Sequence, residues 1–267
     1  MVWTTCIRGA IGVALSLGLV CVDAAPSGAE WYMAGYGGTS AGSKLRDVTM
    51  PDHGFSLAKA RPEYAFVPAN GDQLIQNFKT SDITLSNSPI FGAKVGYFFE
   101  APSFTWLGIE ADIFTLKSDI KPATLSTDQD ITYSPGPNTI GSCSTLITAP
   151  CPRTIVQKGQ FALTASSLRV SAMTFNLIAR YPGSVLQPYV GVGAGAFYFK
   201  STGQFDGKQF SPGFNALAGL KIKASDEWGL FAEGRYNLAS VNNLDPTFGL
   251  SGMYSMFHLV AGVSFHF

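Results

Sequence analysis

The sequence predicts an all-β fold, namely an eight-stranded antiparallel transmembrane up-and-down β-barrel with two long outer loops. Eight separate segments carry apolar residues at every second position, which is the periodicity of a strand with two different faces. Most of these segments have 10 to 13 residues, and a tilted strand needs ~9–11 residues to cross a bilayer. Their connections alternate between long and short, as in membrane barrels with short inner turns and longer outer loops.

The composition suits short strands and interfacial aromatic rings. The chain has 267 residues, enough for one medium domain, with 29 glycines and 13% aromatic residues. Lysine plus arginine balances aspartate plus glutamate at 18 each, so the formal net charge is zero. A nucleic-acid-binding protein would need a basic surplus, and no nucleic-acid partner is therefore expected.

The N-terminal segment has the pattern of a secretory signal peptide. Arg8 supplies a positive charge, and residues 11–22 form an apolar core. This core is too short to span a bilayer, which takes ~20 residues. We expect cleavage after Ala24, so that residues 1–24 are removed and residues 25–267 form the membrane β-barrel domain.

The four cysteines divide into two pairs. Cys6 and Cys21 lie in the segment that is expected to be removed. Cys21 also opens a lipoprotein alternative, but Val20 before it is larger than such a site usually allows. Cys143 and Cys151 lie in a Pro/Ser/Thr-rich segment, and in an oxidising compartment this pair predicts a disulfide that closes a small loop. A metal site is the alternative, but it would need more ligands, and no histidine lies nearby.

The first half of the barrel domain contains three predicted strands and most of the loop residues. The strands cover residues 30–39, 90–100 and 106–116. In the third strand, Glu110 and Asp112 alternate with apolar residues, so the two acids share one face. The two long outer loops are predicted at residues 40–89 and 117–165, the first with a short helix near residues 74–79.

The second half contains five predicted strands with shorter connections. The strands cover residues 168–181, 188–200, 213–223, 228–238 and 256–267. In the last strand, apolar residues alternate from Phe257 to Phe267. Such a face on the edge strand of a soluble protein would be an aggregation site, whereas lipid can cover it.

A soluble eight-stranded lipocalin-like barrel is the main alternative, since it has its apolar face inside. Aromatic residues at the ends of the predicted strands favour the membrane barrel, because they suit girdles at the two membrane interfaces. These residues are Trp31, Tyr97, Phe99, Trp106, Tyr181, Tyr198, Trp228, Phe265 and Phe267.

Several segments resemble a known family. The pattern Gly262-x-x-Phe265-x-Phe267 is similar to the closing strand of bacterial outer-membrane β-barrels, although Val260 stands where that family often has a polar residue. The segments PYVGVGAG (188–195), FAEGRY (231–236) and GVSFHF (262–267) resemble OmpA-type barrels and opacity-type porin-family surface proteins.

This resemblance implies a location and a set of partners. The location is the outer membrane of a Gram-negative bacterium, with outer-membrane lipid and lipopolysaccharide around the barrel. Gly262, Phe265 and Phe267 would be the signal that the barrel assembly machinery reads. A monomer is the expected state.

If the apolar faces meet lipid, the charged residues of the strands point into the lumen. They are Lys94, Glu110, Asp112, Arg180, Lys221, Glu233 and Arg235. An eight-stranded barrel is just wide enough for side chains to fill, and opposite charges buried there should pair. We expect a salt-bridge plug centred on Glu233 and Arg235, which the family resemblance also implies; an ion path lined by the same charges is the alternative.

The expected function is a structural or surface-interaction role, with residues 40–89 and 117–165 available to a host or surface ligand. A narrow pore for small solutes or ions is one alternative. A lipid A-modifying enzyme is a remote one, since some eight-stranded outer-membrane barrels use serine and histidine near the outer rim. Ser255, His258 and His53 are the candidates, but they form no local motif, so we expect no enzyme. No cofactor or metal motif is found in the sequence.

Overall fold

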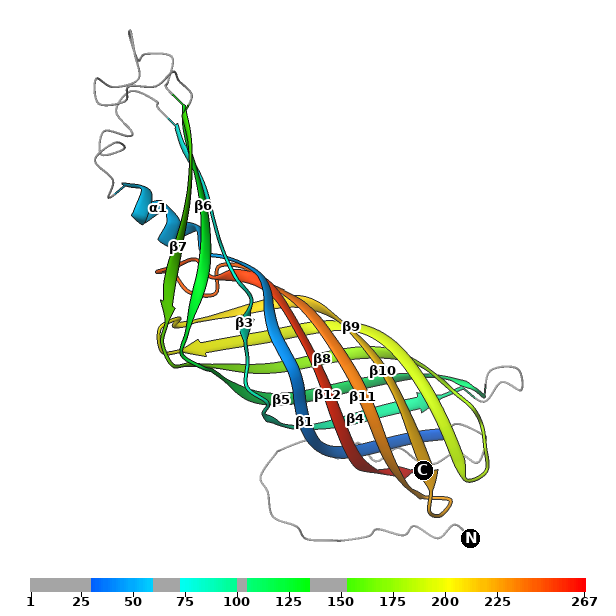
Figure 1. The fold of residues 1–267 in the computed structure, drawn as a ribbon. Coiled ribbons are helices and arrows are strands. Elements are labelled where there is room, and N and C mark those ends of the chain that lie inside the picture. Colours follow the sequence, from blue (N-terminus) through cyan, green and yellow to red (C-terminus); the bar gives the residue numbers. More distant parts are fainter. Residues whose placement is uncertain (1–29, 60–72, 100–104, 135–152) are drawn as a thin grey trace, which may run out of the picture.

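The chain forms a closed antiparallel barrel, which confirms the predicted fold class. The computed structural model describes residues 30–59, 73–99, 105–134 and 153–267. Neighbouring strands follow the order β12-β11-β10-β9-β8-β5-β4-β1, and pairing of β1 with β12 closes the wall (Figure 1). The eight strands of the wall are β1 (Glu30–Thr49), β4 (Pro89–Phe98), β5 (Leu107–Ile120), β8 (Ser166–Arg180), β9 (Leu186–Thr202), β10 (Gly207–Lys223), β11 (Trp228–Val241) and β12 (Ser251–His266).

The two faces of the wall differ as the period-two pattern predicts. Large apolar side chains point outward and are about half exposed or more, including Phe91, Ile113, Phe175, Val192, Phe214 and Leu259. The alternate residues of the same strands are buried in the lumen. Near the end where β1 begins, aromatic rings pair on the outer surface, with ring centroids 5.0 Å apart for Trp31–Tyr97 and for Trp228–Phe265. We call this the inner end and the opposite rim the outer end.

Three further strands and a helix extend the barrel beyond its outer end. They are α1 (Pro51–Lys59), β2 (Gln73–Thr80), β6 (Ala123–Ser134) and β7 (Arg153–Leu163). The two-residue strand β3 (Ile83–Thr84) pairs with Lys44 and Leu45 of β1 and so lies beside the wall. The β6–β7 hairpin rises from the rim, and β2 pairs with β6 (Figure 1). We call α1, β2, β6 and β7 together the outer extension. Within the described residues, no helix is long and apolar enough to span a membrane.

The structure corrects the predicted outer loops. Much of residues 40–89 and 117–165 is β-structure, and the predicted helix near residues 74–79 is part of strand β2. The helix lies instead at Pro51–Lys59, where Pro51 occupies the first position, at which a missing N–H costs nothing. Strand β2 forms because it pairs with β6 over eight positions, which is a tertiary contact that a local pattern does not reveal.

The wall strands also run further outward than predicted. Strand β1 continues to Thr49 instead of ending near Thr39, and β12 begins at Ser251. The register of β1 against β12 shifts between Ala41 and Lys44, where Gly42 has a φ of 63°. Such a bulge moves later residues to the other face, so the alternation that marks a strand is lost in the sequence.

Candidate functional site in the lumen

Tyrosine rings lying over glycines organise the charged lumen. Tyr32 lies over Gly96 on the neighbouring strand, and its hydroxyl donates to Glu110 Oε2 on the strand beyond, at 2.6 Å. A Cβ at Gly96 would stand 2.4 Å from the Tyr32 ring. The glycine is therefore required for the tyrosine to reach across one strand to an acid on the next.

The same arrangement recurs on the other side of the barrel. Tyr189 lies over Gly219, and its hydroxyl donates to Glu233 Oε2 at 2.8 Å. In both cases the tyrosine, the glycine and the acid occupy one row of the sheet register. In each row, the tyrosine hydroxyl holds the acid by a hydrogen bond that needs no cation. Sequence reasoning missed these rows because the register of neighbouring strands is not readable from one strand.

Lys94 joins two of these acids. Its Nζ lies 2.8 Å from Glu233 Oε2 and 3.1 Å from Glu110 Oε2. The ammonium also lies 4.4 Å from the centroid of the Phe231 ring. Lys94 is only 6% exposed, so its charge is compensated by these carboxylates and by the ring rather than by bulk water.

Arg235 forms the other half of the central network and is 1% exposed. It pairs with Glu233 on its own strand and with Asp112 on β5. Its Nη1 donates to the hydroxyl of Tyr36 at 2.7 Å, and that hydroxyl donates to Asp112 Oδ1, also at 2.7 Å. We call Lys94, Glu110, Asp112, Glu233 and Arg235 the central network.

The other two predicted lumen charges lie apart from this network, at the inner mouth. Arg180 forms a two-pronged ion pair with Glu30, in which Nη1 and Oε1 are 2.7 Å apart. Lys221 Nζ lies 3.9 Å from the same Oε1, and His266 Nδ1 lies 2.9 Å from it. We call these four residues the mouth cluster. Sequence reasoning missed Glu30, although its alternation with Tyr32 places both side chains on one face.

An amide-rich layer lies next to the central network. Asn176 Nδ2 donates to Glu110 Oε1 at 3.2 Å, and Asn215 Nδ2 donates to Asn176 Oδ1 at 2.9 Å. His258 is fully buried in this region and lies 5.8 Å from Phe114, measured between ring centroids. The layer therefore separates the charged inner half of the lumen from an apolar outer half.

Aromatic side chains fill the outer half. Phe114, Phe197, Phe199 and Tyr254 are buried, with ring centroids 5.2–6.5 Å apart in successive contacts. Met256 lies beside them and accepts a hydrogen bond from the Tyr254 hydroxyl at 2.8 Å. This apolar layer belongs to the main hydrophobic core, which continues to the outer rim.

Helix α1 and residues 242–250 cover the outer rim, and we call them the outer cover. The centroid of the His53 ring lies 5.1–5.3 Å from the ring centroids of Phe78, Phe161 and Phe248. The Asp245 carboxylate accepts backbone N–H bonds from Phe248 at 2.7 Å and from Leu250 at 3.2 Å, which fixes the loop. Partial burial among these rings lowers the pKa of His53 from its ordinary value of 6.5.

The residues considered for catalysis lie apart. His258 faces the lumen, whereas Ser255 lies three positions away on the opposite face of the same strand. The Ser255 hydroxyl lies 2.7 Å from the hydroxyl of Tyr236 on the outer surface. His53 belongs to the outer cover. Within the described residues, no group of three or more histidine, cysteine, aspartate or glutamate side chains could hold a metal ion.

Of the expected assembly signal, Phe265 and Phe267 lie at the inner end, whereas Gly262 lies further along β12, paired with Tyr36 and Phe231. Phe265 and Phe267 point outward, and the backbone of Phe267 exchanges two hydrogen bonds with Trp31, at 3.0 and 3.2 Å. Gly262 lies under Tyr36 and Phe231, where a Cβ would stand 2.7 and 2.8 Å from atoms of those side chains. Residues 1–24, Cys143 and Cys151 lie outside the described residues.

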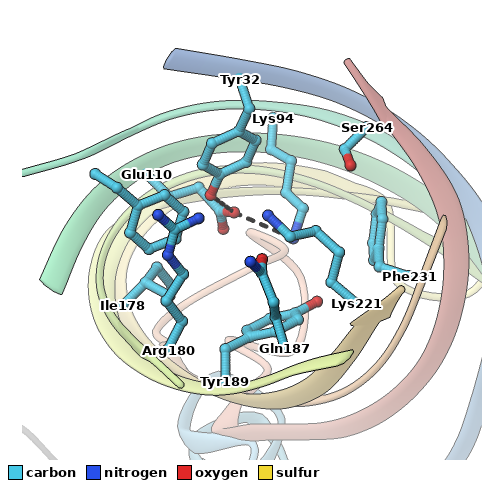
Figure 2. Close-up of a pocket in the computed structure, with 11 residues that line it drawn as sticks. Tyr32, Lys94, Glu110, Ile178, Arg180, Gln187, Tyr189, Lys221, Phe231 and Ser264 are labelled. Atoms are coloured by element: carbon cyan, nitrogen blue, oxygen red, sulfur yellow. Dashed lines mark hydrogen bonds and ion pairs between the residues drawn. The ribbon is translucent and has the colours of Figure 1, made fainter. Parts of the chain in front are cut away.

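A small cavity opens between the central network and the mouth cluster (Figure 2). Its volume is about 20 Å³, enough for about one water-sized particle. Charged and polar residues in its lining are Lys94, Glu110, Arg180, Gln187, Tyr189, Lys221 and Ser264. The remaining lining consists of Tyr32, Phe98, Ile178 and Phe231, so it is mostly aromatic.

Comparisons with known proteins returned outer-membrane barrels of low sequence identity. No family model matches the chain, and no curated protein matches its sequence. Neisserial surface protein A is 14% identical with a TM-score of 0.45, and the alignment covers 90% of this chain and 100% of that one. Ail, the attachment invasion locus protein of Yersinia pestis, solved with the heparin analogue sucrose octasulfate, is 11% identical with a TM-score of 0.40 and coverages of 90% and 99%. OprG from Pseudomonas aeruginosa is 12% identical with a TM-score of 0.40 and coverages of 90% and 96%.

The chain itself has the architecture of an outer-membrane β-barrel. Its wall is closed, its outward face is apolar, and aromatic rings gather at the inner end. The predicted location, the outer membrane of a Gram-negative bacterium, agrees with this wall.

Proposed function

We propose that this chain is a closed, non-enzymatic outer-membrane barrel whose role is structural or lies in contacts made by its outer extension. The observation that carries the proposal is that two layers of side chains fill the lumen, apart from the small cavity near the inner mouth. Paired charges occupy the inner half, and buried aromatic rings occupy the outer half. A solute would have to displace both layers to pass.

The two layers resist passage for different physical reasons. Opening the central network would separate buried opposite charges, which costs ~3–5 kcal/mol for a single broken pair. Opening the aromatic layer would remove contacts among Phe197, Phe199 and Tyr254, all of which are fully buried. A narrow pore would need an aqueous path through both, so the closed barrel is the better supported function.

The outer extension supports the role in surface contacts. Ile75 on β2 is 59% exposed and Val156 on β7 is 66% exposed. Both lie beyond the barrel wall, so membrane lipid does not account for these exposed apolar side chains. Strand β7 pairs with β6 on one side and ends the strand order of the sheet. A rigid scaffold that presents exposed apolar residues and a strand edge suits recognition of another molecule.

Single-channel conductance of the refolded protein in a planar bilayer tests the closed lumen. Refolding is verified by the gel-mobility difference between heated and unheated samples. We expect a silent or rarely flickering bilayer for the wild type and for Arg169→Ala, which removes an exposed arginine from β8. Steady conductance whose ion preference changes in Glu233→Gln or Arg235→Ala would establish the narrow pore instead.

Replacing the hairpin tests the role of the outer extension. A variant in which residues 123–163 become a short turn keeps the eight wall strands. We expect it to refold with unchanged gel mobility behaviour but to lose adhesion of expressing cells to extracellular-matrix proteins. Adhesion equal to that of the full chain would remove the hairpin from the proposal.

Lipid A analysis tests the non-enzymatic part of the proposal. Ser255 and His258 lie on opposite faces of β12, which supports the absence of a serine–histidine pair there. Mass spectra of lipid A from cells with and without the protein should be identical. A change that disappears in His258→Ala would establish a lipid A-modifying enzyme.

A further inference from the structure

The charges of the lumen are separated along the barrel axis. The central network has two cations, Lys94 and Arg235, against three carboxylates, so its formal charge is −1. The mouth cluster has two cations, Arg180 and Lys221, against the single carboxylate of Glu30, so its formal charge is +1 with His266 neutral. Within the described residues, the mouth cluster therefore contains one cation more than its carboxylate can neutralise.

Lys221 is that cation. It is 7% exposed, and the closest carboxylate oxygen among the described residues, Glu30 Oε1, is 3.9 Å from its Nζ. Arg180 already engages both oxygens of Glu30. The nearest described polar partner of Lys221 is the Nε2 of His266, at 3.4 Å. A buried ammonium with no close counter-charge is costly unless an anion reaches it.

Arg180 adds a second unused donor at the same place. Its two Nη atoms face Glu30, and its Nε is buried without a hydrogen-bond partner among the described residues. Arg180 is 9% exposed, and both Arg180 and Lys221 line the small cavity of the inner mouth. Figure 2 shows both side chains and the Gln187 amide projecting into the space enclosed by the strands.

The cavity limits the size of any ligand. Its volume of about 20 Å³ accepts one water-sized particle and leaves no room for a sugar or a nucleotide. Three of the four charged lining residues, Lys94, Arg180 and Lys221, are cationic, and Glu110 is the fourth, so the cavity favours negative charge over neutral ligands. We propose that the inner mouth of the lumen binds a single monovalent anion of halide size between Lys221 and Arg180.

The stability of the refolded full-length barrel in detergent micelles tests the site, with chloride as the probe. Unfolding midpoints are compared in sodium chloride and sodium gluconate at equal ionic strength, because gluconate is too large for the cavity. Ligand binding to the folded state raises the midpoint, and we expect chloride to raise it by roughly 2–4 °C. Lys221→Met should abolish this difference, whereas Lys200→Met, which removes an exposed lysine from β9, should retain it.

Bromide soaked into crystals of the wild type provides an independent measurement. We expect an anomalous peak between Lys221 and Arg180. In the unfolding experiment, Lys221→Gln replaces Lys221→Met if the latter does not refold. An equal midpoint in chloride and gluconate, a chloride effect that persists without Lys221, or the absence of the bromide peak would each overturn the proposal.

Discussion

Lys94 on β4 and Glu233 on β11 meet in the lumen with Nζ and Oε2 2.8 Å apart, although 139 residues separate them in the sequence. Two strands, β1 and β12, lie between β4 and β11 in the wall. The contact therefore bridges the seam at which the first and last strands close the barrel. A lysine that also reaches Glu110 ties this seam to β5.

Replacing Lys94 by methionine should destabilise the barrel strongly. The change keeps most of the side-chain volume but leaves Glu110 and Glu233 without their shared cation, and breaking a buried pair in this way costs ~3–5 kcal/mol. Urea unfolding of the refolded protein measures the loss. The control Lys200→Met removes an exposed lysine and should change the free energy of unfolding little. If the two variants are equally stable, the central network does not hold the seam.

A double variant tests whether Lys94 stabilises the barrel through its contact with Glu233. Lys94→Met combined with Glu233→Gln removes one of the two carboxylates that Lys94 contacts, and so lowers the excess negative charge of the network. We expect it to be more stable than Lys94→Met alone, because residues in one network do not have additive effects. Additive losses would mean that the two residues act independently.

The tyrosine–glycine rows give a second prediction. A Cβ at Gly219 would stand 2.5 Å from the Tyr189 ring and 2.9 Å from the carbonyl oxygen of Ala232, so Gly219→Ala must displace the ring from Glu233. Overpacking of this kind costs about 1–3 kcal/mol. Gly35→Ala is the matched control, since nothing lies within 4 Å of a Cβ there. Urea unfolding should place Gly35→Ala near the wild type and Gly219→Ala well below it.

The parts of the structure that the sequence predicts are those with a local, period-two signal. The eight wall strands alternate cleanly over their inner halves, and the same alternation puts Lys94, Glu110 and Arg235 on the lumen face, where the structure has them. The outer extension carries no such signal. Strand β2 depends on pairing with β6, and the bulges of β1 reverse the alternation before Thr49.

The sequence pattern does not predict which lumen charges pair with one another. Alternation predicts which face of a strand a residue is on, but not the register between strands, which sets its position along the barrel axis. It therefore could not show that Arg180 and Lys221 lie apart from Glu233. The same limit concealed Glu30 and the Tyr32–Gly96–Glu110 row, which exist only once three strands are in register.

The expected assembly signal predicts a difference between folding in vitro and in cells. The Phe267 side chain is 51% exposed on the outer surface, so Phe267→Ala should refold in detergent with nearly wild-type stability. In cells, the amount of folded protein in the outer membrane should fall, because the resemblance to outer-membrane barrels implies that this residue belongs to the assembly signal. Phe214→Ala removes another outward phenylalanine, 71% exposed, and should assemble normally. Equal cellular yields of the two variants would contradict the signal.

The outer cover should loosen in acid because of His53. Burial lowers the pKa of the His53 imidazole while α1 is docked on the barrel, so the docked state favours the neutral ring. When α1 is undocked, the exposed His53 should titrate near its ordinary value of 6.5. Above that pH the ring is neutral in both states and the contribution to stability is fully present. As the pH falls through 6.5, the undocked state gains a proton first, and the docking of α1 weakens until the pH passes the lowered pKa.

Hydrogen exchange of the α1 amides, corrected for intrinsic rates, measures this effect between pH 7.5 and pH 5.5. We expect faster relative exchange of residues 51–59 at the lower pH in the wild type. His53→Phe keeps a ring among Phe78, Phe161 and Phe248 but removes the titrating nitrogen, so its α1 protection should not depend on pH. A wild type and a variant that respond alike would assign the acid sensitivity to another group.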